Sequence, residues 1–181
     1  MVVQRHNLNG DAQADLTVHG GAHKAVYLYP AEHYPAWRAE LPEMELPWGM
    51  FGENFTAEGI LEGTSHIGDR LRVGTCVLRV TEPRLPCYKL GLRFGRDDII
   101  KRFLESARTG FYLTVEQEGE VQTGDTFELA GRDAHGVTVA DITRVFARDK
   151  TDLATMRRVV TVPSLSPSWR DHFEEILQKS T

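Results

Sequence analysis

Apolar and polar residues alternate along much of the stretch between Ile60 and Leu129, and glycines interrupt the alternation at short intervals. In a pleated strand every second side chain lies on the same face, so this pattern is typical of half-buried β-strands. The pair Gly68-Asp69 is echoed by Gly124-Asp125, and each pair leads into a new alternating run. Two similar hairpin turns of this kind favour a small closed or nearly closed barrel over a parallel sheet.

The alternation changes phase near Gly74. Leu71 and Val73 lie at odd positions, whereas Cys76 and Leu78 lie at even positions. A β-bulge at Gly74 would bring both sets to the core face, because a bulge adds one residue to one strand. Cys76 is then predicted to be an inert core residue, since free cysteine is among the most buried residue types. Two further strands are predicted over residues 26–29 and 112–115.

Helical spacing replaces the alternation at two places in this region. Apolar residues from Ile99 to Ala107 lie on one helical face, with Asp98 as the predicted N-cap and Gly110 as the left-handed residue at the C-terminal end. A second helix is predicted over residues 30–37. Because Pro35 removes a main-chain hydrogen bond there, we expect that helix to be short or kinked.

After Gly136 the spacing changes to three short helical units, over 138–146, over 151–159 and from Ser166 onward, where Pro167 occupies the first helical position. About 45 residues are too few to be stable alone, so these helices are expected to pack on the barrel. The predicted fold class is therefore mainly β. It comprises a β-barrel domain over residues 1–135 with peripheral helices, and a C-terminal three-helix subdomain over residues 136–181.

Composition narrows the class of function. The 21 basic and 26 acidic residues give a net charge of −5, which disfavours binding to the phosphates of nucleic acid. No apolar stretch approaches the ~20 residues of a membrane span, and the first residues lack the apolar core of a secretory signal. Two cysteines cannot form a disulfide framework in a chain of this length. We therefore expect a cytoplasmic protein with no nucleic-acid or membrane partner.

The segment Pro83–Leu90 is the most unusual part of the sequence. Two prolines precede Cys87 and stiffen the backbone, which favours a side chain held at the rim of a barrel. Arg84 and Lys89 flank the cysteine, and neighbouring positive charge favours the thiolate that acts as a nucleophile or a metal ligand. Residues 84–102 hold six basic residues and two aspartates, so a small anion is an expected ligand. The alternative is a rigid loop with an incidental cysteine.

A second candidate anion site comprises the segment His19-Gly20-Gly21 and Lys24. Glycine main-chain N–H groups and a lysine can approach an anion closely, and His19 would serve as a hydrogen-bonding or acid/base group. His19 and His23 have the spacing of zinc ligands on a helix, but the two glycines between them argue against a helix. A simple turn before the strand at Val26 is the alternative.

Glu53 and Asn54 form a polar pair between two aromatic residues, Phe51 and Phe55. A buried glutamate is rare unless it is paired. The two side chains are therefore predicted either to read a heterocycle or to order the neighbouring loops. A hydrogen-bonded loop anchor is the alternative.

Six ordered motifs lie in the first half of the chain, between Gly10 and Leu90. They are Gly10-Asp11 with Gln13-Ala14-Asp15, His19-Gly20-Gly21 with Lys24-Ala25-Val26, Tyr29 with Glu32-His33-Tyr34 and Trp37, Phe51–Asn54, Ile67–Asp69, and Pro83-Arg84 with Pro86–Leu90. This set resembles the MOSC domain, named for the C-terminal domain of molybdenum cofactor sulfurase, and most closely its YiiM-like branch. The helical tail, with Leu165–Trp169, resembles the three-helix domain of that branch. Such chains usually have a further N-terminal segment with a strand, so we expect this barrel to close differently or its start to be truncated.

The resemblance implies a MOSC-type β-barrel with a molybdenum–pterin cofactor in its cleft and Cys87 as the protein ligand to the metal. A metal already held by a dithiolene accepts a thiolate readily and keeps an open position for substrate. Basic side chains and main-chain N–H groups would offset the negative charge of the cofactor. The residues expected to bind the cofactor are Cys87, Arg84, Lys89, Lys24, Gly20, Gly21 and Asn54.

Proteins of this kind reduce N-hydroxylated compounds, notably hydroxylaminopurine base analogues. The implied activity is therefore a molybdenum-cofactor-dependent reduction that breaks an N–O bond with two electrons and two protons, releasing water and leaving an amine. His19 and Glu53 are the candidate proton handlers beside Cys87. The sequence contains no flavin, haem or iron–sulfur motif, so a separate reductase is expected to supply the electrons.

Two other classes of function stay open at this point. A non-catalytic molybdopterin or sulfur carrier would bind the same cofactor without turnover. A cysteine hydrolase would use Cys87 with His19 and with Asn54 or Asp15 on esters or amides, although no local signature supports such a triad. The sequence does not decide the oligomeric state, and a homodimer is compatible with it.

Overall fold

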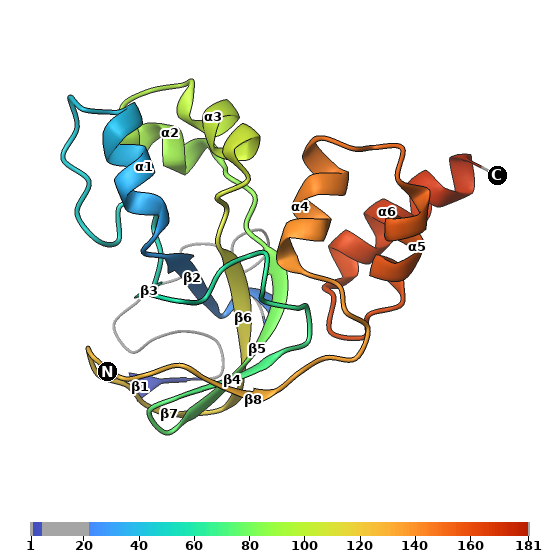
Figure 1. The fold of residues 1–181 in the computed structure, drawn as a ribbon, viewed down its shortest axis with the longest axis horizontal. Coiled ribbons are helices and arrows are strands. Elements are labelled where there is room, and N and C mark those ends of the chain that lie inside the picture. Colours follow the sequence, from blue (N-terminus) through green and yellow to red (C-terminus); the bar gives the residue numbers. More distant parts are fainter. Residues whose placement is uncertain (1, 5–21, 181) are drawn as a thin grey trace.

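The computed structural model describes residues 2–4 and 22–180. Its main sheet has six strands in the order β3-β2-β6-β5-β4-β8, antiparallel throughout except for the parallel pair β2 and β3, and the short strands β1 and β7 form a separate antiparallel pair. The strands are β1 (Val2–Val3), β2 (Val26–Pro30), β3 (Phe55–Ala57), β4 (Arg70–Val73), β5 (Cys76–Pro83), β6 (Phe111–Gln117), β7 (Gly119–Glu120) and β8 (Glu128–Gly131). The sheet curls into a half-barrel whose edges are β3 and β8 (Figure 1). The prediction of a small barrel-like β-domain is confirmed.

Two groups of helices flank the sheet, with α1 to α3 at one end and α4 to α6 at its side (Figure 1). Their bounds are η1 (Ala22–Lys24, a 3-10 turn), α1 (His33–Glu40), α2 (Tyr88–Phe94), α3 (Ile99–Ser106), α4 (Val139–Ala147), α5 (Leu153–Val160) and α6 (Pro167–Lys179). The three C-terminal helices agree with the prediction, including Ser166 as N-cap and Pro167 at the first helical position. Helix α2 was not predicted, because Pro83 and Pro86 favoured a rigid loop. No helix in the described ranges is long and apolar enough to cross a bilayer.

The repeated Gly-Asp pairs form two similar turns. Gly68 and Gly124 have φ angles of 95° and 94°, which favour glycine, and they occupy the third position of four-residue turns. The Asp69 carboxylate accepts from the N–H of His66, and the Asp125 carboxylate accepts from the residue three positions before it in the same way. Neither turn joins two strands that pair with each other, so the prediction of hairpin turns was wrong although the repeat itself is real.

The true hairpin lies at Gly74. Val73 pairs directly with Cys76, so Gly74 and Thr75 form a two-residue turn between β4 and β5. Gly74 has a φ of 53°, and a side chain there would overlap the main-chain oxygen of Glu120. The predicted bulge at Gly74 was therefore wrong, because the phase of the alternation changes where the chain reverses. Cys76 lies on the core face with no exposed surface, as predicted.

The two other helix predictions need smaller corrections. Helix α1 is short, as expected, and Pro35 is its third residue, where a main-chain N–H has no helical partner in any case. Helix α3 ends with Ala107 in the left-handed conformation, whereas the prediction gave that position to Gly110. Asp98 is the N-cap residue, but its carboxylate binds Arg96 and Arg102 and caps no helical N–H.

Strand β2 is buried on both faces and separates two apolar cores. Its residues Val26 and Leu28 belong to a core shared by the sheet and the C-terminal helices, whereas Tyr27 and Tyr29 belong to a core shared with α1 to α3. Trp169 on α6 lies in the same cluster as Val26, which shows that the tail packs on the half-barrel. The two helix groups therefore pack on opposite faces of β2, one through each core.

Candidate functional site

Cys87 lies where the chain leaves the end of β5 and turns into α2. Pro83 ends the strand, Pro86 precedes the cysteine, and Cys87 is the N-cap residue of the helix. Its thiol is half-buried and lines two cavities, one of about 350 Å³ and one of about 220 Å³. Tyr112 on β6 also lines both. The two cavities therefore meet at Cys87, with Tyr112 between them.

The smaller of the two, here called the basic cavity, holds a cluster of cationic side chains. It is lined by Phe51, Gly52, Arg84, Cys87, Lys89, Leu90, Arg93 and Tyr112. Lys89 and Arg93 are exposed, whereas Arg84 is only 8% exposed. Three cations around one small cavity favour an anionic ligand.

Arg84 is a buried cation without a full set of partners. Its guanidinium carbon lies 5.0 Å from the centre of the Tyr27 ring and 5.2 Å from that of Phe103. Its Nη1 has no hydrogen-bond partner among the described residues. Burial lowers the pKa of Arg84, but Tyr27, Tyr112 and Cys87 together raise it above its ordinary value, so the group stays charged. Because burying an incompletely paired charge is costly, this position is suited to an anion that completes its hydrogen bonds.

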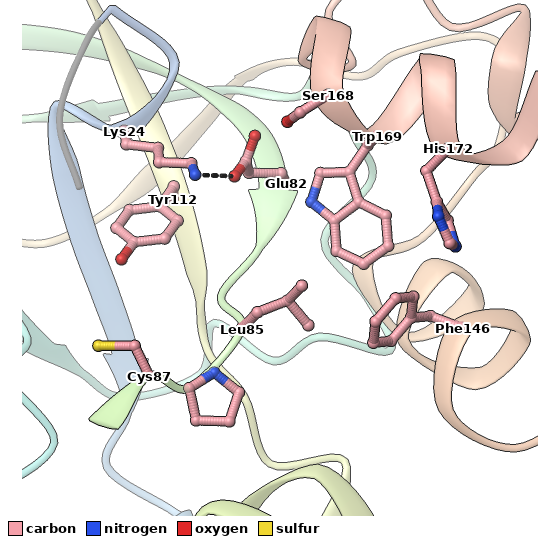
Figure 2. Close-up of a pocket in the computed structure, with 10 residues that line it drawn as sticks. Lys24, Glu82, Leu85, Cys87, Tyr112, Phe146, Ser168, Trp169 and His172 are labelled. Carbon is pink, nitrogen blue, oxygen red and sulfur yellow. Dashed lines mark ion pairs between the residues drawn. The ribbon is translucent and has the colours of Figure 1, made fainter. Parts of the chain in front are cut away.

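The larger space, here called the α6 cavity, lies between the end of β5 and the C-terminal helices (Figure 2). Its lining residues are Lys24, Glu82, Leu85, Pro86, Cys87, Tyr112, Phe146, Ser168, Trp169 and His172. Phe146 and Trp169 pack edge to face with ring centres 5.0 Å apart, and His172 lies beside them. The helices thus supply an aromatic wall suited to a planar ring.

Lys24 and Glu82 form an ion pair on the sheet side of the α6 cavity (Figure 2). Lys24 Nζ lies 3.4 Å from Glu82 Oε1, while Glu82 Oε2 has no hydrogen-bond partner among the described residues. Burial raises the pKa of Glu82, and the nearby Ser166 and Lys24 offset this only in part. Thr81 donates a hydrogen bond of 2.6 Å to the main-chain oxygen of His23, which fixes the position of Lys24. The cavity therefore contains a buried acid with one unpaired oxygen.

Four of the predicted site residues meet here. Cys87, Arg84, Lys89 and Lys24 surround the two cavities, as the sequence suggested. His19, Gly20 and Gly21 lie outside the described residues, as does Asp15, so their roles stay predictions.

Glu53 and Asn54 lie elsewhere, on neither cavity at Cys87. The Glu53 carboxylate accepts hydrogen bonds from the Tyr34 hydroxyl, the Thr56 hydroxyl, and the N–H groups of residues 49 and 51. Asn54 and Tyr27 exchange two hydrogen bonds of 2.8 Å, which attach the loop to β2. These contacts match the alternative of a loop anchor, because the Glu53 carboxylate is occupied by hydrogen bonds that order its own loop.

Glu82, Arg93, Trp169 and His172 were not singled out from the sequence as site residues. Glu82 could have been recognised as a site residue from the sequence, because it is a charged residue at the end of a predicted strand, directly before the Pro-Cys segment. It follows Thr81, which is buried. The spacing of Trp169 and Phe173 along the tail indicates an apolar helix face, and Trp169 does belong to the buried core as well as to the cavity. His172 gave no signal, because only the packing of α6 brings it to the cavity.

Replacing Arg84 separates ligand binding from stability. We expect Arg84→Met to lower retention of an anionic cofactor at least about tenfold, because a charge-assisted contact is lost. The free energy of unfolding should change by no more than about 1 kcal/mol, since loss of the ring contacts is offset by removal of a buried charge. Retention of the bound anion and thermal melting measure the two effects.

Arg108→Met is the matched control. Arg108 stacks on Trp37 at 4.7 Å and pairs with Glu40, but it lines neither cavity. Its replacement should leave cofactor retention unchanged. Equal loss of the bound anion in the two variants would contradict a ligand-binding role for Arg84.

Comparison with known proteins agrees with this geometry. Residues 15–128 match the MOSC domain, and residues 137–179 match the YiiM-like, 3-alpha helix domain. The uncharacterized protein YflK of Bacillus subtilis (strain 168) is 40% identical over 173 residues, which cover 96% of this chain and 78% of YflK. Protein YiiM of Escherichia coli (strain K12) is 34% identical over 164 residues, which cover 90% of this chain and 73% of YiiM.

A protein named reductase from Gibberella moniliformis (strain M3125 / FGSC 7600) is 35% identical over 157 residues, which cover 85% of this chain but only 28% of that longer protein. The crystal structure of YiiM from Escherichia coli superimposes with a TM-score of 0.87 at 28% identity, covering 99% of this chain and 86% of that one. The half-barrel, the Pro-Cys segment and the three C-terminal helices are thus those of the MOSC domain family with a YiiM-like 3-alpha helix domain, and this chain belongs to that family.

Proposed function

We propose that this protein is a molybdenum-cofactor-dependent reductase of N-hydroxylated compounds, hydroxylaminopurine base analogues among them. One observation carries the proposal: the Cys87 thiol lies between a cavity with a buried, incompletely paired cation and a cavity with a buried acid and an aromatic wall. The first is suited to an anionic cofactor and the second to a planar substrate. Membership of the MOSC family and the reductase name of one relative support the same conclusion.

The residues at Cys87 fit a molybdenum–pterin cofactor. Cys87 would be the protein ligand to the metal. Arg84, Lys89 and Arg93 would bind the phosphate group of the pterin and offset its negative charge. A metal held by the two sulfurs of a pterin dithiolene needs few protein ligands, so a single thiolate is sufficient. When bound, the cofactor supplies two-electron exchange with the substrate.

The reaction breaks the N–O bond of a hydroxylamine. Two electrons and two protons enter, the oxygen leaves as water, and the nitrogen remains as an amine. A separate reductase protein would deliver the electrons. Within the α6 cavity, Trp169 and Phe146 would orient the ring of the substrate, and Lys24 would help to hold the polar end near Cys87.

The direct test compares cofactor-loaded and cofactor-free protein. Molybdenum content is measured first, and reduction of a hydroxylaminopurine is then followed with a chemical electron donor. We expect turnover only by the loaded protein. Molybdenum binding without reduction would favour a carrier, and ester or amide hydrolysis by metal-free protein would favour a cysteine hydrolase. Either result would overturn the proposal.

The exposed rim of the basic cavity gives a salt-dependent prediction. Lys89→Gln should weaken cofactor retention about threefold to tenfold at low salt, and the difference from the unmodified protein should narrow at high salt, because the lost contact is itself screened there. The loss in Arg84→Met should stay nearly constant, because Arg84 is buried. The molybdenum that each variant retains after dialysis at a low and at a high salt concentration measures both losses. A deficit in Lys89→Gln that stays the same at both concentrations would argue against a surface contact with the cofactor.

A further inference from the structure

We propose that Glu82 donates the proton that releases the oxygen of the substrate as water, an inference that rests on the proposed reductase function. Glu82 lies on β5 and lines the α6 cavity together with Cys87. Only 2% of its surface is exposed, and its Oε2 has no hydrogen-bond partner among the described residues. Figure 2 shows the Lys24–Glu82 pair on the sheet side of this cavity and Trp169 on the helix side.

The other two glutamates that are held inside the fold differ from Glu82 in their contacts. The Glu53 carboxylate accepts four hydrogen bonds, from its own loop, from β3 and from α1. The Glu62 carboxylate lies 2.8 Å from His33 Nε2 and accepts from the N–H of Gly110 at 2.7 Å. Both bind neighbouring segments together. Glu82 instead lines a cavity large enough for a substrate and pairs there with Lys24, as a proton donor to that cavity must, while its Oε2 is buried close to Ser166.

The surroundings of Glu82 act on its pKa in opposite directions. Burial raises the pKa of Glu82, whereas Ser166, Lys24 and His23 lower it. Tyr112 and His172 also line the cavity, and Arg84 approaches Tyr112 from the other side. The net effect is a raised pKa, so Glu82 stays protonated at a higher pH than an ordinary glutamate.

The proton on the Glu82 carboxyl goes to the hydroxyl oxygen of the substrate while the N–O bond breaks, and the oxygen leaves as water. The two electrons come from the external donor through the loaded protein, and the nitrogen takes the second proton from solvent. The Glu82 carboxylate that remains pairs with Lys24 and is protonated again from solvent.

The first test measures turnover per bound molybdenum against pH. In the unmodified protein the rate should fall as pH rises through the pKa of Glu82, because only the protonated acid donates. Glu82→Gln should lose about 100-fold or more in kcat and lose this dependence, with molybdenum content retained. Glu82→Asp should keep part of the activity and the dependence. The exposed variant Glu128→Gln is the control and should match the unmodified protein.

Lys24→Met tests the role of Glu82 by removing the lysine that pairs with it. Removing the cation should raise the pKa of Glu82 further, so the fall in rate should move to higher pH. A second readout needs no activity: NMR of side-chain carboxyl carbons in the cofactor-free full chain should show one glutamate, absent in Glu82→Gln, that titrates above the others and still higher in Lys24→Met.

The outcomes separate the two proposals. If loaded protein reduces the substrate but Glu82→Gln keeps the rate and the pH dependence, the proton-donor role is overturned and the reductase function stands. A Glu82 carboxyl that titrates with the ordinary glutamates would also overturn it. If loaded protein reduces no N-hydroxylated compound, the reductase function is overturned, and the proton-donor role with it. If Glu82→Gln does not fold, the Glu82→Asp profile and the Lys24→Met shift decide.

Discussion

Cys87→Ser is expected to yield a folded protein that has lost reductase activity about a thousandfold or more, equivalent to about 4 kcal/mol in activation free energy. A serine hydroxyl is a far poorer ligand than a thiolate for a soft, sulfur-bound metal, so most bound molybdenum should be lost as well. Because Cys87 is only half-buried at the start of α2, the melting temperature should change little. Activity, molybdenum content and thermal melting are the measurements.

Cys76→Ser is the matched control, since it makes the same substitution in the core. Cys76 has no exposed surface, and burial raises the pKa of its thiol, which keeps it neutral and unreactive. Placing a hydroxyl there should cost about 1–3 kcal/mol of unfolding free energy, while activity per folded molecule is retained. Equal loss of activity in two well-folded variants would contradict the separate roles of the two cysteines.

Ending the chain at Gly136 is expected to abolish cooperative folding of the half-barrel. The segment after Gly136 contributes many buried residues to the core that it shares with the sheet, namely Val137, Val139, Ile142, Val145, Met156, Val159, Val162, Leu165, Trp169 and Phe173. Each such burial stabilises by roughly 1.5–3 kcal/mol, against a total stability of roughly 5–15 kcal/mol. Truncation also removes the main-chain hydrogen bonds from Ile67 to Val137 and from Val139 to Ser65.

Thermal melting by circular dichroism and binding of a hydrophobic dye measure this effect. We expect the truncated chain to show no sharp transition and to bind the dye. The control chain ends at Leu177, because Gln178, Lys179 and Ser180 are exposed, and it should melt like the full chain. A truncated chain that melts sharply and binds molybdenum would show that the half-barrel is independent of its helices.

The strands and helices of this protein could be predicted wherever neighbouring residues specify them. Val26–Tyr29 and Tyr112–Val115 lie within β2 and β6, and the caps and apolar spacing of the tail located its three helices. The predictions were wrong where one local sequence pattern is compatible with more than one backbone structure. The phase change at Gly74 fits a bulge or a chain reversal, and only pairing between β4 and β5 distinguishes them.

By itself the sequence determined the alternating strands, the three C-terminal helices and the Pro-Cys segment with its basic neighbours, because period, caps and proline stiffness act between residues close along the chain. Only the tertiary structure decided which polar groups do chemistry. It gives the Glu53 carboxylate four hydrogen-bond donors, whereas Glu82 Oε2 and Arg84 Nη1, on the two cavities that Cys87 lines, have no partner among the described residues. The physical reason is that the cost of a buried charge depends on partners such as Lys24, which only the packing of distant segments brings within reach.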